Sequence, residues 1–183
     1  LLDNILDLSK LESGKMDYEM SRTNLKQIVN NISEEFITLI NEKGLVLEIE
    51  ENNIPTEIVC DENKISQVIR NFLSNAIKFT SIGNNISVFF ESGKLIIGNN
   101  ETVIALRCNI SNLGAIIPED ELNKIFEKFY QSSKTKTGAG GTGLGLAICK
   151  EIIIGHNGKI WAENNPDGGA TFSFLLPYHQ DLN

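Results

Sequence analysis

The stretch DENKISQVIRNFLSNAIKFT, residues 61–80, decides how this chain folds. Its apolar residues recur every three or four positions, which predicts an amphipathic helix, and Asp61 is suited to cap the first turn. A stripe of polar side chains follows the same spacing along this helix. It consists of Lys64, Gln67, Asn71, Asn75 and Lys78. The stripe is either a solvated helix face or a row of groups that bind a ligand.

The chemistry of this stripe suits a phosphate ligand with a metal ion. Asparagine oxygens can coordinate Mg²⁺. Lys78 lies one turn beyond Asn75 and can meet a phosphate as a point charge. We therefore keep both interpretations of the stripe, and look elsewhere in the chain for a second element that would bind phosphate.

Helices and strands follow each other irregularly on both sides of the central helix. We expect strands at residues 16–20, 45–49, 57–60, 86–90, 94–97, 103–110, 159–163 and 170–176, and further helices at residues 24–44, 119–126 and 144–155. An irregular succession of this kind predicts a mixed sheet with helices on one face, a two-layer α/β sandwich over residues 15–178. Residues 1–14 are expected to form the end of a longer helix, and residues 179–183 a tail.

A glycine-rich run, GAGGTGLGL at residues 138–146, precedes the last expected helix. Glycines let backbone N–H groups approach a polyphosphate closely, and the N-terminus of a helix adds partial positive charge. No strand ends directly before the run and it lacks the Walker Lys-Ser/Thr ending, so it is neither a Rossmann nor a Walker loop. Lys134 and Lys136 lie just upstream, on a segment expected to close over a nucleotide. Alone, the run is a weak signal, because flexible linkers are similar.

Composition excludes several classes of protein. The net charge of −8 argues against a nucleic-acid partner. Cys60, Cys108 and Cys149 are odd in number and lie in apolar surroundings, which indicates reduced core thiols and a cytosolic domain. No apolar run reaches the roughly 20 residues that a membrane helix needs, although a longer parent protein could be membrane-anchored.

The order of the motifs resembles that of the sensor histidine kinases of two-component signalling, whose nucleotide domain has the Bergerat (GHKL) fold shared with gyrase-type ATPases. Residues 67–80 are similar to the family's N box, residues 125–131 to its F box, residues 141–148 to its G2 box and residues 168–174 to its final glycine box. The first residues are similar to the end of a dimerisation helix. The phosphoacceptor histidine would then precede Leu1.

This resemblance implies an ATP- and Mg²⁺-dependent kinase. It phosphorylates a histidine on its own dimerisation domain and passes the phosphoryl group to a response regulator. The parent protein is expected to be a homodimer, and this piece alone a monomer. By the same resemblance Asn71 and Asn75 hold Mg²⁺, and Asn71 and Lys78 are the catalytic residues. The other residues implied at the nucleotide are Asn112, Gly114, Ile116, Ile117, Phe126, Phe129, Lys136, Gly141, Thr142, Gly143, Leu144, Gly145, Leu146 and Thr171.

Position 71 separates two kinds of chemistry within the resemblance. Hydrolytic relatives carry a glutamate there as general base, whereas an asparagine cannot take a proton at neutral pH. We therefore expect ATP to be held for an external acceptor. His156, at the end of a helix, is expected to be a structural capping residue, and of the two F box phenylalanines one is expected to pack in the core.

The chain departs from the family at the G1 box, to which residues 112–118 correspond. Asn112 replaces an aspartate that accepts from the adenine amino group, which predicts weaker ATP binding. Ile116 replaces a glycine and is expected to reshape or partly fill the adenine end. Phe79 replaces a frequent tyrosine. Two alternatives therefore stay open, a non-catalytic scaffold domain and a serine-directed kinase or ATPase of the same superfamily.

Overall fold

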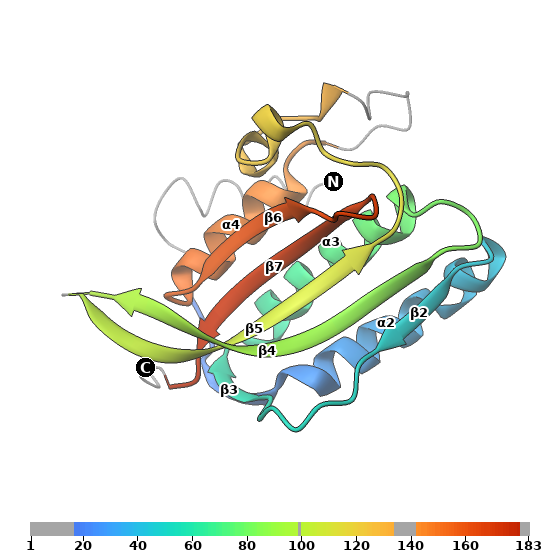
Figure 1. The fold of residues 1–183 in the computed structure, drawn as a ribbon. Helices are drawn as coiled ribbons and strands as arrows, with labels where there is room; N and C mark the ends of the chain where they lie inside the picture. Colours follow the sequence, from blue (N-terminus) through green and yellow to red (C-terminus); the bar gives the residue numbers. More distant parts are fainter. Residues whose placement is uncertain (1–16, 99, 134–141, 180–183) are drawn as a thin grey trace.

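The computed structural model describes residues 17–98, 100–133 and 142–179. The sheet and helix layers confirm the predicted two-layer α/β class (Figure 1). The helices are α2 (Leu25–Glu42), α3 (Glu62–Phe79) and α4 (Gly145–Gly155), with 3-10 turns η1 (Glu119–Glu121) and η2 (Lys124–Phe126). The strands are β1 (Ser21–Asn24), β2 (Val46–Ile49), β3 (Glu57–Cys60), β4 (Asn85–Ile97), β5 (Glu101–Asn112), β6 (Lys159–Asn164) and β7 (Ala170–Pro177).

Five strands form the main sheet in the order β2-β4-β5-β7-β6. β2 runs parallel to β4, and the other neighbours are antiparallel. Figure 1 shows α2, α3 and α4 side by side on one face of this sheet, with α3 between the other two. β1 and β3 form a separate antiparallel pair. One face of the sheet is therefore covered by helices, and α3 is the middle helix of that layer.

The central helix folds as its sequence pattern predicts. The Asp61 carboxylate accepts a hydrogen bond from the Lys64 backbone N–H at 3.0 Å and caps the first turn. Phe72 is fully buried, and its ring centroid lies 5.3 Å from that of Phe172 and 6.1 Å from that of Phe174, both on β7. The remaining buried residues of the helix are Ile65, Val68, Ile69, Leu73, Ala76 and Ile77.

Two strand predictions need correction. Residues 17–20 form no strand; pairing begins at Ser21, opposite Cys60 of β3. Residues 86–90 and 94–97 belong to one continuous strand, β4. Gly93 lies within this strand, and a Cβ there would come within 2.6 Å of the Leu175 Cδ2 atom. The glycine serves close packing against β7, not a turn.

The helix predicted at residues 119–126 is instead the two short 3-10 turns η1 and η2. The Glu121 N–H donates to the Pro118 carbonyl, and the Glu127 N–H donates to the Lys124 carbonyl. Both bonds span three residues, not four, so neither turn continues as an α-helix. The predicted helix end at residues 1–14 lies outside the described residues.

The three cysteines are free and buried, which confirms their assignment as core thiols. Burial raises the pKa of the Cys60 thiol to about 12, so it stays protonated and unreactive at neutral pH. Within the described ranges, none of the helices combines the length and the apolar character that a membrane crossing requires.

Candidate functional site

The polar stripe of α3 meets the first turn of α4. Gly145 begins α4 directly beside Asn71, and a Cβ added to Gly145 would overlap the Asn71 Oδ1 atom. Lys64, Gln67, Asn71 and Asn75 are half-buried, and Lys78 is exposed. The stripe is therefore not a plain solvated face. It lines the place where the glycine-rich segment begins a helix.

A glycine also fixes the approach of the F box to this helix. The Phe129 N–H donates to the Gly143 carbonyl at 2.9 Å, and both residues have positive φ, 62° and 68°. A Cβ at Gly143 would lie 2.7 Å from the Phe129 carbonyl carbon. Phe126 is buried against Phe172, whereas Phe129 is 67% exposed. The prediction that one F box ring packs in the core is thus confirmed for Phe126.

The residues around Gly143 complete the start of α4. Thr142 is exposed, and its hydroxyl accepts a hydrogen bond from the Leu144 N–H at 3.3 Å. Leu144 is buried and Leu146 half-buried, so both anchor the helix to the core. The predicted site residues Lys136 and Gly141 lie outside the described part of the chain.

Glu121 is a residue of this region that the sequence motifs did not reveal. Its carboxylate accepts from the Ser133 N–H at 3.2 Å, from the Ser133 hydroxyl at 2.5 Å and from the Ser132 hydroxyl. These hydrogen bonds, that of Ser132 first, lower the pKa of Glu121 below its usual value. The buried carboxylate therefore ties the chain that follows Phe129 to η1. An acid followed at a distance by two serines is too common a pattern to have predicted this.

Asn112, the last residue of β5, lies near the C-terminal end of α3, where the polar stripe ends at Lys78. Asn112 is 3% exposed, and its side-chain Nδ2 has no hydrogen-bond partner among the described residues. Two glycines pack against the backbone around it. A Cβ at Gly114 would overlap the carbonyl oxygen of Phe79, at the end of α3, and a Cβ at Gly169 would overlap the Asn112 carbonyl oxygen. The G1 box, the final glycine box and the end of α3 are thereby brought together.

The isoleucines that follow Gly114 are accommodated without strain. The Ile117 N–H donates to the Asn164 Oδ1 at 2.9 Å, and the Asn164 amide donates to the Ile117 carbonyl at 2.7 Å. Ile116 is 45% exposed and is not among the described non-glycine residues with positive φ. Its backbone does not need a glycine, and the expectation that its side chain reshapes or partly fills the adenine end stays a prediction.

Thr171 does not join the other predicted site residues. Its hydroxyl lies 2.9 Å from the Ser111 hydroxyl and 2.7 Å from the Asn165 Oδ1 atom. Because strand side chains alternate, Thr171 points to the opposite face of β7 from Phe172, which contacts α3. The predicted role at the nucleotide is therefore not supported by its position; it fastens β7 to the turn before it.

His156 is structural, as predicted. It is fully buried; its Nε2 accepts from the Asp61 N–H at 3.0 Å, and its Nδ1 lies 2.7 Å from the Ile152 carbonyl. The Tyr18 ring packs edge-on, with centroids 4.8 Å apart. Burial lowers the pKa of His156 below its ordinary value, so the ring stays neutral.

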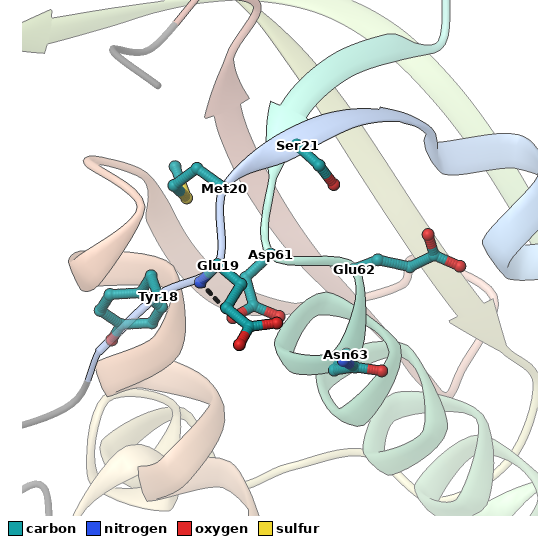
Figure 2. Close-up of a pocket in the computed structure, with 7 residues that line it drawn as sticks. All are labelled: Tyr18, Glu19, Met20, Ser21, Asp61, Glu62 and Asn63. Carbon is teal, nitrogen blue, oxygen red and sulfur yellow. Dashed lines mark hydrogen bonds between the residues drawn. The ribbon is translucent and has the colours of Figure 1, made fainter. Parts of the chain in front are cut away.

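Figure 2 shows a hollow at the N-terminal end of α3. Its volume is about 670 Å³. Within the hollow, the Asp61 carboxylate accepts a hydrogen bond from the Glu19 N–H at 3.0 Å. Three of its lining residues are acidic, which disfavours a polyphosphate. The lining residues are Tyr18, Glu19, Met20, Ser21, Asp61, Glu62 and Asn63.

The fold and the site together define a nucleotide-binding domain in which a polar helix faces a glycine-led helix N-terminus. Residues 60–180 match the family model described as histidine kinase-, DNA gyrase B- and HSP90-like ATPase. The chain therefore belongs to this family.

Two relatives and two solved structures are similar to this chain and indicate the class of protein within the family. The chain is 37% identical over 178 residues to hybrid signal transduction histidine kinase D of Dictyostelium discoideum, and 31% identical over 183 residues to the sensor histidine kinase WalK of Bacillus subtilis (strain 168). These alignments cover 97% and 99% of the chain, but only 11% and 28% of the two relatives.

The nucleotide-free catalytic domain of the histidine kinase ThkA aligns with a TM-score of 0.73 and 30% identity, over 89% of this chain and 97% of that one. The ThkA structure solved with response regulator protein TrrA aligns with a TM-score of 0.73 and 26% identity, over 97% of this chain and 48% of that one.

Proposed function

We propose that this chain is the ATP-binding catalytic domain of a sensor histidine kinase and that it presents the γ-phosphoryl group of Mg-ATP to a histidine. The contact between Asn71 and Gly145 carries this proposal, because it joins the polar stripe to the start of α4. The named relatives and the ThkA catalytic domain support the kinase class.

The phosphate end of the site fits Mg-ATP. Asn71 and Asn75 would supply oxygen ligands for Mg²⁺, and Lys78 and the α4 N-terminus would face the phosphates. Among the described residues, no group of three or more His, Cys, Asp or Glu side chains could hold a metal ion. The nucleotide's own phosphates would therefore complete the coordination. When bound, the ion neutralises charge on the phosphates.

The receiving histidine lies outside the described residues in this proposal. His156 is unsuited, because it is fully buried and both ring nitrogens have partners. Asn71 cannot act as a base toward water. The domain's own contribution is then positioning and charge neutralisation, while an imidazole brought by a dimerisation domain attacks the γ-phosphorus.

The partners follow from the same proposal. ThkA was solved with the response regulator TrrA, which supports a receiver domain as the next phosphoryl acceptor for this protein. We place the domain in the cytoplasm of a homodimeric parent protein, in keeping with its three free, buried cysteines.

The test is phosphoryl transfer in the full-length protein that contains this domain, with γ-labelled ATP. We expect an acid-labile, base-stable label that disappears in Asn75→Ala. An acid-stable label would instead indicate a serine-directed kinase, and release of free phosphate without labelling would indicate an ATPase.

A further inference from the structure

We propose that Asn112 makes this site accept 6-oxopurine nucleoside triphosphates, such as inosine triphosphate, about as well as ATP. The inference rests on the proposed function, because it assigns Asn112 to the base of the bound nucleotide. It concerns which base is accepted, which the family assignment leaves open.

The position of Asn112 is the first part of the argument. Its register partners are Ile86 on β4 and Ala170 on β7. Strand alternation places its side chain on the same face as Cys108 and Ile110, which belong to the core beneath the helices. The side chain therefore points into the helix layer, near the end of α3, and not toward the open face of the sheet.

The missing hydrogen bond is the second part. A buried amide group without a partner is costly, and nearly all such groups in folded proteins are paired. Asn112 is 3% exposed, yet its Nδ2 has no partner among the described residues. Its neighbours Ala170 and Gly114 have no polar side-chain atoms to offer. In this inference the missing partner is the base of the bound nucleotide.

The chemistry of a carboxamide is the third part. A carboxylate only accepts hydrogen bonds, so it favours the 6-amino group of adenine and repels a carbonyl oxygen at position 6. A carboxamide has both a donor and an acceptor. The Nδ2 group can donate to a 6-oxo group, and a half-turn of the amide presents Oδ1 to a 6-amino group.

The backbone around Asn112 is held in a fixed position, which the rotation of the amide requires. Gly114 packs on the Phe79 carbonyl and Gly169 on the Asn112 carbonyl, so the backbone around Asn112 is held in place. The Asn112 carbonyl is also bonded by the Asn165 amide at 3.0 Å. The side-chain amide can therefore rotate while the backbone stays fixed, and it can present either its donor or its acceptor to the base. A site that binds both 6-amino and 6-oxo purines needs this property.

The experiment is calorimetric titration of the chain with Mg-ATP, Mg-ITP and magnesium tripolyphosphate, beside Asn112→Asp and Asn112→Ala. We expect the unaltered chain to bind ATP and ITP within about threefold of each other, and Asn112→Asp to favour ATP by about tenfold or more, the worth of one lost base contact. Asn112→Ala should weaken both triphosphates by the same factor. Tripolyphosphate, which has no base, should bind all three proteins equally.

The outcomes separate this inference from the proposed function. If ATP binds but ITP is already at least tenfold weaker with Asn112 in place, the inference is wrong and the function stands. An unchanged ATP-to-ITP ratio in Asn112→Asp would also overturn it. If a buried aspartate unfolds the domain, Asn112→Ala decides instead, and unchanged affinity of that variant for both triphosphates would overturn the inference. If no triphosphate binds to any of the three, the proposed function itself fails.

Discussion

Two polar side chains are buried near opposite ends of α3, and they differ in how their hydrogen bonds are met. His156, near the N-terminal end, is fully buried with a partner for each ring nitrogen. Asn112, near the C-terminal end, is 3% exposed and leaves its Nδ2 without a partner in the described protein. The hydrogen bonds of the His156 ring are all made within the fold, whereas the Asn112 amide lacks one.

The difference teaches which buried polar group is structural and which awaits a ligand. A buried group with all of its bonds stabilises the fold, and removing it leaves its partners unsatisfied. A buried group that lacks a bond costs stability, and its presence calls for another reason. Burial alone would have placed His156 and Asn112 in the same category.

The largest expected effect comes from removing the satisfied group. His156→Ala deletes a buried ring and leaves the Asp61 N–H without its partner, so we expect a loss of about 3 kcal/mol in the free energy of unfolding. Urea denaturation measures it, with His179→Ala in the exposed tail as the matched control. A loss below about 1 kcal/mol would contradict a structural role for the ring.

The next effect separates binding from stability at the other end. Asn112→Leu keeps nearly the same shape and removes the unpaired amide, so we expect the free energy of unfolding to stay within about 1 kcal/mol or to rise. Affinity for Mg-ATP should fall about tenfold, because the base loses its hydrogen bonds. Denaturation and calorimetry on the same sample measure both quantities. A marked loss of stability with unchanged affinity for Mg-ATP would mean that Asn112 is structural and does not bind the nucleotide.

The pH dependence of stability sharpens the comparison at His156. Burial lowers its pKa in the folded state below 6.5, so below pH 6.5 the unfolded chain binds a proton that the folded chain resists. The contribution of the neutral His156 ring to the free energy of unfolding is therefore complete above pH 6.5. It is lost as the pH falls, by at most about 1.4 kcal/mol per pH unit. The pKa of Glu121 is lowered from 4.5, so its effect begins only in more acid solution. Unfolding measured from pH 7 to 5 should show this slope in the unaltered chain and not in His156→Ala.

The smallest effect tests whether an unsatisfied group is enough by itself to indicate a ligand. The Ser33 hydroxyl on α2 is also buried without a partner in the described protein. None of the described glycines packs against it as Gly114 and Gly169 pack around Asn112. Ser33→Ala should raise stability by roughly 0.5 kcal/mol and leave ATP and ITP affinity unchanged. Weaker nucleotide binding in this variant would mean that the missing bond at Asn112 is not a specific indication.

The sequence predicted the central elements well where local signals agree. The Asp61 cap and the apolar period predicted a helix to Phe79, and α3 spans Glu62–Phe79. Glycine was harder to interpret. Separate strands were predicted at residues 86–90 and 94–97, yet Gly93 lies within one strand and packs against Leu175, a contact between residues far apart in the chain.

The site was predictable in its motifs but not in its contacts. The stripe on α3 and the glycines before α4 indicated a phosphate site, whereas their meeting at Asn71 and Gly145 is a product of tertiary packing. The motif that contains Thr171 did not reveal which face of β7 it occupies, and that single-residue alternation moves its side chain away from α3. Glu121 and its serines leave no local pattern at all.

Calorimetric titration of the intact chain with Mg-ATP, beside Gly145→Ala, tests the central claim most directly. A Cβ at Gly145 would displace the Asn71 side chain and crowd the α4 N-terminus. The account predicts one-site binding with a Kd below about 1 mM, and at least tenfold weaker binding in a Gly145→Ala protein of unchanged stability. No binding by the intact chain at millimolar ATP, or equal binding by both proteins, would contradict a nucleotide site between α3 and α4.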